Sequence, residues 1–98
     1  MELLLDGPVL TLGDRWWAIS TKRGLLLALL AAHDGFLERE DIYRAVLGDR
    51  WFCYSNPRGH ISVLVNHLRK ELGGTSYRII TGRNIGYKLV KEDDGESD

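Results

Sequence analysis

The stretch from Pro57 to Leu72 carries side chains suited to recognising nucleic acid. Its apolar residues recur at helical spacing, which predicts an amphipathic helix with one buried face. They are Ile61, Leu64, Val65, Leu68 and Leu72. The opposite face and its flanks hold Arg58, Ser62, Val63, Asn66, His67, Arg69 and Lys70. Such a set can read base edges in the major groove of DNA and neutralise phosphates. The alternative is an ordinary solvated helix face.

No residues of the sequence are arranged for catalysis or metal binding. The pair Gly73-Gly74 follows the predicted helix, whereas a phosphate-cradling glycine loop opens one. Cys53, His60 and His67 lack the close Cys/His pairs of a zinc site. A chain of 98 residues also leaves little room for a deep substrate cavity beside its core. We therefore expect a protein that is not an enzyme and uses no metal or other cofactor.

Charge is segregated along the chain, although the formal net charge is only -1. Residues 1 to 49 hold five Lys/Arg against eight Asp/Glu, and residues 50 to 91 hold eight against one. Residues 92 to 98 hold five acids and no base. The basic middle block has the charge expected of a nucleic-acid-binding surface, although surface charge can also segregate by chance.

Turn residues divide the N-terminal stretch into three short strands, which predicts a small antiparallel sheet. The strands are Leu3 to Leu5, Val9 to Leu12 and Arg15 to Ile19. Adjacent positions of a strand point to opposite faces. Of Trp16 and Trp17 we therefore expect one to lie in the core and the other to be partly exposed.

Two further helices follow this sheet. Ser20 and Thr21 are candidate caps for a helix over residues 21–33, whose leucine run should form the centre of the core. Acids in the first turn and Gly48 at the end predict a second helix over residues 38–47. The recognition stretch is then the third helix, because Asn56-Pro57 is a favourable helix start.

The remaining segments are a loop, a hairpin and a tail. Residues 49–56 show no periodicity and gather Trp51, Phe52 and Tyr54, which either cover the core or anchor a protein partner. Runs from Tyr77 to Thr81 and from Ile85 to Val90 predict a hairpin whose tip carries Arg83. Residues 1–91 should form one domain, and the acidic residues 92–98 a disordered tail.

Location follows from what the sequence lacks. The longest apolar run, Leu25 to Ala32, is eight residues, too short to cross a bilayer. The N-terminus has no signal-peptide pattern, and Cys53 is the single cysteine. We expect a cytoplasmic protein that does not enter the membrane.

Nearly the whole chain, about residues 3 to 90, resembles the OmpR/PhoB-type winged helix-turn-helix effector domain of bacterial response regulators. The resemblance rests on the run LRKEL at residues 68–72, followed by T-G-R-x-x-G-Y-K-L from Thr81 to Leu89. It also rests on Ile19-Ser20, Arg39-Glu40-Asp41-Ile42, Val46-Leu47-Gly48 and His60-Ile61-Ser62-Val63. It implies an α+β fold with an N-terminal antiparallel sheet, three helices and a C-terminal hairpin wing.

The resemblance implies sequence-specific binding of duplex DNA in transcriptional regulation, with helix 57–72 in the major groove and wing 81–87 at the adjacent minor groove. The expected contacts are Arg58, Gly59, His60, Ser62, Val63, Asn66, His67, Arg69, Lys70, Thr81 and Arg83. It further implies two copies side by side on a repeated site, and contact with RNA polymerase through the loop that holds Trp51, Phe52 and Tyr54. We expect at least one of these three aromatics to make that contact, with Trp51 or Tyr54 the best candidates.

The chain departs from the family pattern at several positions. Arg23 and Gly24 replace an acid and a bulky residue in the first helix, and Glu38 replaces a capping serine or threonine. Gly59, Asn66 and His67 stand where the third helix often has arginines. The missing arginines of the third helix, the near-neutral net charge and the aromatic loop leave an alternative. In it, the winged helix is a protein-interaction module for RNA polymerase or another regulator, with little DNA binding.

Overall fold

The computed structural model of the chain describes residues 2–92. The N-terminal sheet contains strands β1 (Leu4–Asp6), β2 (Val9–Leu12) and β3 (Arg15–Ala18), paired in the order β1-β2-β3. Both pairings are antiparallel, as the turn pattern predicts. Trp17 is buried with 7% of its surface exposed, and its neighbour Trp16 is 66% exposed. The strand alternation therefore assigned one tryptophan to the core, as expected.

Three helices form the centre of the molecule: α1 (Lys22–Ala32), α2 (Arg39–Leu47) and α3 (Pro57–Glu71). Thr21 caps α1 by accepting a hydrogen bond from the Gly24 amide, and Asn56 caps α3 through the Gly59 amide. Glu38, the first residue of the predicted second helix, lies at the N-cap of α2, and its side chain makes no capping hydrogen bond. The predicted ends of all three helices agree with the structure to within one residue.

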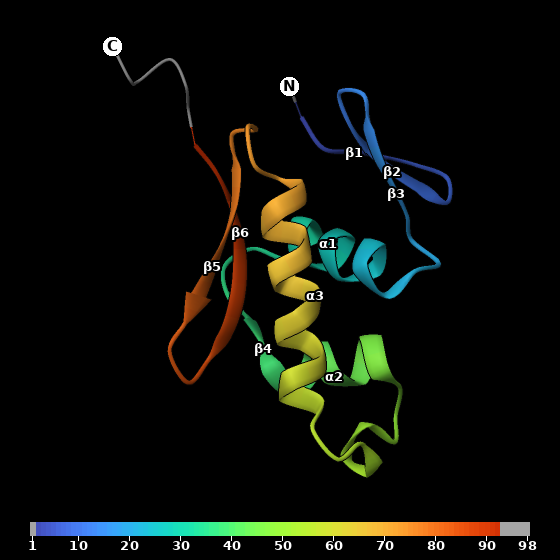
Figure 1. Cartoon of the computed structure of the whole chain (residues 1–98), viewed down its shortest axis with the longest axis vertical. Helices are drawn as coiled ribbons and strands as arrows, with labels where there is room; N and C mark the ends of the chain where they lie inside the picture. The colour runs from blue at the N-terminus through green and yellow to red at the C-terminus, as the bar shows by residue number, and fades with distance from the viewer. Residues whose placement is uncertain (1, 93–98) are drawn as a thin grey trace.

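The helices meet in one hydrophobic core. Leu26, Leu27 and Leu30 of α1 are essentially without solvent exposure, so α1 is the central helix, as its leucine run predicts. The apolar stripe of α3 packs on it through Ile61, Val65 and Leu68. Leu64 is the exception to the predicted stripe, since it is only partly buried. In Figure 1, α3 crosses the face of the molecule, with α1 behind it and α2 near its N-terminal end.

The C-terminal hairpin joins a second sheet of order β4-β6-β5, built from β5 (Tyr77–Gly82), β6 (Gly86–Lys91) and the two-residue strand β4 (Leu37–Glu38). The sequence pattern did not predict β4. Its pairing places Glu38 opposite Gly86 and attaches the hairpin to the start of α2. A β-carbon at Gly86 would lie 1.9 Å from the Leu37 carbonyl oxygen, so only glycine allows this approach. The hairpin lies along one side of α3 (Figure 1).

Two sequence expectations need correction at this level. The aromatic segment 49–56 is not wholly irregular, because Trp51–Cys53 forms a short 3₁₀ helix, η1. Glu92, assigned to the tail, is held to the hairpin by its amide, which donates to the Ser76 carbonyl, and by its carboxylate, 2.7 Å from Arg78. The predicted disorder of residues 93–98 lies outside the described residues.

The two departures in the first turn of α1 have structural partners. Arg23 forms an ion pair with Glu71 at 3.0 Å, and the other carboxylate oxygen of Glu71 accepts a hydrogen bond from the Trp17 indole at 2.8 Å. Gly24 lies against the backbone of β3, where a β-carbon would come within 2.0 Å of the Ala18 carbonyl oxygen. Glu71, at the end of α3, therefore joins the N-terminal sheet and α1 to α3.

Candidate nucleic-acid interface

One face of α3 is open to solvent along its length. His60, Val63, Asn66 and His67 are all exposed on the side opposite the buried stripe, and Val63 keeps 53% of its surface accessible. Gly59 and Ser62 are only partly exposed. Lys70 is exposed near the far end of the helix, where it borders Trp16 and Arg15 of the N-terminal sheet. The predicted contacts on α3 therefore extend from Arg58 to Lys70, over more than three turns of the helix.

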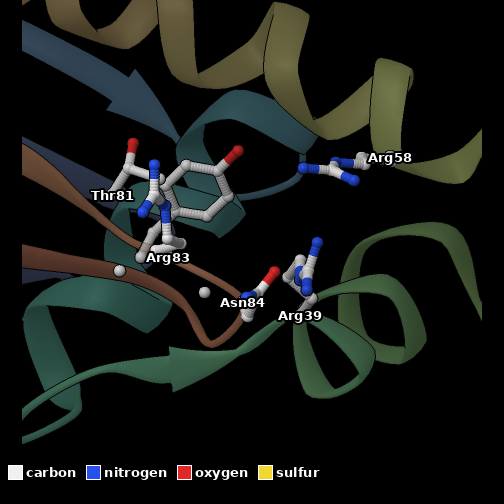
Figure 2. A pocket seen from close by; sticks show the side chains of 8 residues that line it. Arg39, Arg58, Thr81, Arg83 and Asn84 are labelled. Atoms are coloured by element: carbon white, nitrogen blue, oxygen red, sulfur yellow. The ribbon is translucent and has the colours of Figure 1, made fainter.

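Three arginines from three elements surround one open pocket between α3 and the hairpin. The pocket measures about 350 Å³, and Arg58 of α3, Arg39 of α2 and Arg83 of the hairpin tip line it. Thr81 and Asn84 add a hydroxyl and an amide (Figure 2). None of the described residues that line it is acidic. The guanidinium groups supply only hydrogen-bond donors and positive charge. The kind of ligand that fits this pocket is therefore an anion.

Sequence reasoning missed Arg39. It lies in an acidic run with Glu40 and Asp41, and nothing local distinguishes it from a solvated helix-start residue. The tertiary structure brings it to the pocket, because its amide donates a 3.0 Å hydrogen bond to the Ile85 carbonyl beside the β4–β6 pairing. The run Arg39-Glu40-Asp41-Ile42 belongs to the family resemblance, which was the one available signal.

The hairpin tip has a defined backbone. The Ile85 amide donates to the Gly82 carbonyl at 3.0 Å, and Asn84 adopts a positive φ of 62° at the third position of this turn. Asparagine tolerates that conformation better than most residues with a side chain. The turn fixes the backbone of Arg83 while its exposed side chain stays free to meet a ligand.

Arg69 differs from the other predicted contacts on α3 because its guanidinium group already makes hydrogen bonds within the protein. Its guanidinium donates two hydrogen bonds to the Ile79 carbonyl, at 3.2 and 3.0 Å, and one to the Thr81 hydroxyl at 2.8 Å. Ile79 and Thr81 belong to β5, so Arg69 joins α3 to the hairpin. Its first role in this structure is to hold the two elements together.

The loop aromatics divide into three environments. Trp51 is half-buried against the buried Tyr43 of α2, with ring centroids 5.1 Å apart. Tyr54 is half-buried against His60 of α3, at 5.2 Å and with planes at 85°. Phe52 has 65% of its surface exposed. Of the three aromatic side chains of this loop, Phe52 is therefore exposed, whereas Trp51 and Tyr54 are half-buried.

An N-terminal sheet, three helices and a C-terminal hairpin, with a basic pocket beside the exposed third helix, define a winged helix-turn-helix domain of the DNA-binding class. Residues 16–89 match the family described as "Transcriptional regulatory protein, C terminal". The match covers most of the chain, and the chain belongs to this family of DNA-binding domains that regulate transcription. It confirms the resemblance found from the sequence motifs.

None of the curated proteins matches the chain. Among the described residues, no helix is long and apolar enough to span a membrane.

Proposed function

We propose that the domain binds duplex DNA sequence-specifically, with α3 in the major groove and the wing, residues 81–87, at the adjacent minor groove. The observation that carries the proposal is the pocket of Arg39, Arg58 and Arg83, which adjoins the exposed face of α3. The guanidinium groups of Arg39 and Arg58 fit neighbouring phosphates of a DNA backbone, and Arg83 lies on the wing side of the same pocket, where the adjacent minor groove would pass.

Each part of the interface has a distinct role in this proposal. Arg39 and Arg58 neutralise phosphate, and Arg83 at the wing tip enters or borders a narrow minor groove, whose negative potential attracts arginine. Asn66 can pair bidentately with adenine, and Val63 can contact a thymine methyl group. Arg69 holds the wing in place through Ile79 and Thr81 and acts on DNA indirectly.

The test is selection from a random duplex pool at two salt concentrations. We expect one enriched motif and a steep loss of affinity as salt rises, because phosphate contacts release counterions. Arg83→Ala should weaken binding and reduce the salt slope by about one, without lowering the melting temperature. Arg78→Ala is the matched control, since Arg78 lies on the same hairpin outside the pocket and pairs with Glu92. The absence of an enriched motif, with weak binding at both salt concentrations, would overturn the proposal.

A repeated arrangement of the selected motif would further support two copies binding side by side, as the resemblance implies. From this role we infer that the protein is a regulator and not an enzyme. We also infer that it acts in the compartment that holds the DNA. We extend this to a cytoplasmic location, which a localisation experiment on the intact protein would test.

One observation favours a second role, contact with a protein such as RNA polymerase. Phe52 lies in the loop between α2 and α3 with most of its surface exposed, while Trp51 packs on Tyr43 and Tyr54 packs on His60. Exposed aromatics are enriched among the anchors of protein interfaces. This role is compatible with DNA binding, because the loop lies beside α3 and outside the arginine pocket.

A further inference from the structure

Tyr54 connects the loop to the first turn of α3 and to the start of α1. Its ring meets the His60 imidazole edge to face, with centroids 5.2 Å apart and planes at 85°. The ammonium of Lys22 lies 5.9 Å from the centroid of the same ring. The tyrosine is thus in contact with one side chain of the exposed α3 face and with one of α1.

His60 has few other constraints on its orientation. It is exposed, and it lines an open hollow of about 420 Å³ together with Lys22, Leu47, Asn56, Gly59, Val63 and Leu64. Within the described part of the chain, no hydrogen bond to its ring is found. A histidine on an open helix face has several rotamers of similar energy, and each removed rotamer costs entropy when a ligand binds.

We propose that Tyr54 is a positioning residue for DNA recognition: it holds the His60 ring in one orientation, so that the loop influences the selected sequence without touching DNA. The proposal rests on the function proposed above. The physical basis is the geometry of the aromatic pair, since an edge-to-face arrangement adds directional energy beyond area burial. Lys22 stabilises the negative face of the Tyr54 ring and so limits its movement.

The test is a double-mutant cycle of Tyr54→Leu and His60→Ala, measured on the duplex selected by the wild-type protein. We expect Tyr54→Leu to weaken specific binding about 2- to 10-fold, the range of an aromatic pair contribution, and to leave binding to an unrelated duplex unchanged. In the His60→Ala background, Tyr54→Leu should cause no further loss. Repeating the random-pool selection with Tyr54→Leu should relax the motif at the positions that His60→Ala also relaxes.

Two further measurements separate positioning from a general structural effect. Tyr54→Phe keeps the ring and should bind like wild type, because the structure shows no hydrogen bond to the Tyr54 hydroxyl within residues 2–92. In the DNA-free protein, the ring-current shift of the His60 imidazole protons should persist in Tyr54→Phe and disappear in Tyr54→Leu. If Tyr54→Leu melts too early for binding to be measured, Tyr54→Met, whose unbranched side chain reaches farther and adapts its shape more readily, replaces it in the cycle.

The outcomes distinguish this inference from the function on which it rests. Additive losses in the cycle, or an equal loss on every duplex, would overturn the positioning role while DNA binding stands. An unchanged His60 shift in Tyr54→Leu would overturn it also. A wild-type protein that selects no duplex would overturn the proposed function and the positioning role together, even if the ring-current shift is present.

Discussion

At the scale of single residues, exposed polar side chains of α3 differ in what they already contact. Asn66 and Arg69 are both exposed and both belong to the set expected to meet DNA. Arg69 makes three hydrogen bonds to β5, whereas no hydrogen bond to the Asn66 side chain is found among residues 2–92. A side chain whose donors and acceptor are free can pair with a base edge without giving up an existing bond.

The first prediction concerns Asn66. Asn66→Ala removes the amide that can pair with adenine, so binding to the selected duplex should weaken by about 1 to 3 kcal/mol and the motif should relax at one position. Affinity for an unrelated duplex, measured in the same titration, should barely change. A uniform loss on all sequences would show that Asn66 contacts phosphate and reads no base.

At the scale of elements, the structure depends on contacts between segments that are distant in the chain. β4 pairs with β6 and brings Arg39 to the wing. Glu71 holds β3 and α1 at the other end of α3 through Trp17 and Arg23. The C-terminal end of α3 is thus joined to the N-terminal sheet and to α1, and the wing is joined to the start of α2. These contacts give the exposed face of α3 a defined orientation relative to the wing.

The second prediction tests Arg69 as the connection between α3 and the wing. Arg69→Ala leaves the part-buried Ile79 carbonyl without these donors, so the free energy of unfolding should fall by roughly 1 to 3 kcal/mol. Denaturant unfolding measures this, and the neighbouring exposed Lys70→Ala serves as the control with little change. Unaltered stability together with a large loss of DNA affinity would mean that Arg69 contacts phosphate directly.

The third prediction separates the aromatics of the loop. Phe52→Ala should abolish transcriptional activation in a reporter assay and leave DNA affinity and melting temperature nearly intact, because the ring is 65% exposed and meets Trp51 of the same loop only edge-on, at 6.1 Å between centroids. Trp51→Ala should instead lower the free energy of unfolding by about 1 to 3 kcal/mol, less than a fully buried aromatic would, since Trp51 packs on Tyr43. Normal activation by Phe52→Ala would place the activation surface elsewhere.

At the scale of the whole molecule, the sign of the net charge is misleading. The chain is slightly acidic, yet the pocket beside α3 gathers three arginines and no acid among its described lining residues. One of these arginines comes from the acidic first half of the sequence. Local charge density, not net charge, determines phosphate attraction within a Debye length of about 10 Å.

The fourth prediction concerns the acidic end. Residues 92–98 hold five acids, and a chain ending at Glu92 would keep the Arg78 ion pair while removing the other four. Such a chain should bind DNA more tightly at low salt and equally at high salt, because the four removed acids no longer compete with phosphate for the basic surface. Its melting temperature should match the full chain, because the contacts of Glu92 with Ser76 and Arg78 are kept. Replacing the same four acids with serine is the matched control for chain length.

The sequence by itself predicted the three helices to within one residue, the three N-terminal strands and the C-terminal hairpin, whereas β4 and η1 were not predicted. Helical spacing, the caps Thr21 and Asn56 and the strand alternation at Trp16 and Trp17 all depend on neighbours within a few residues, and these local preferences agree with the fold. The candidate recognition face of α3 followed from the same periodicity. The motifs from residue 68 to residue 89 further predicted the family that the comparison confirms.

Only the tertiary structure decided which partners the exposed and half-buried side chains meet. Periodicity says which face of an element is buried, and it contains no information on what covers that face or on which remote residue lies beside its edge. Arg39 therefore joined the pocket through a strand pairing that no local pattern marks, and Arg69 became a connection to β5. The separation of Phe52 from Trp51 and Tyr54 has the same cause, because α2 and α3, not the loop itself, provide the surfaces on which two of the three rings pack.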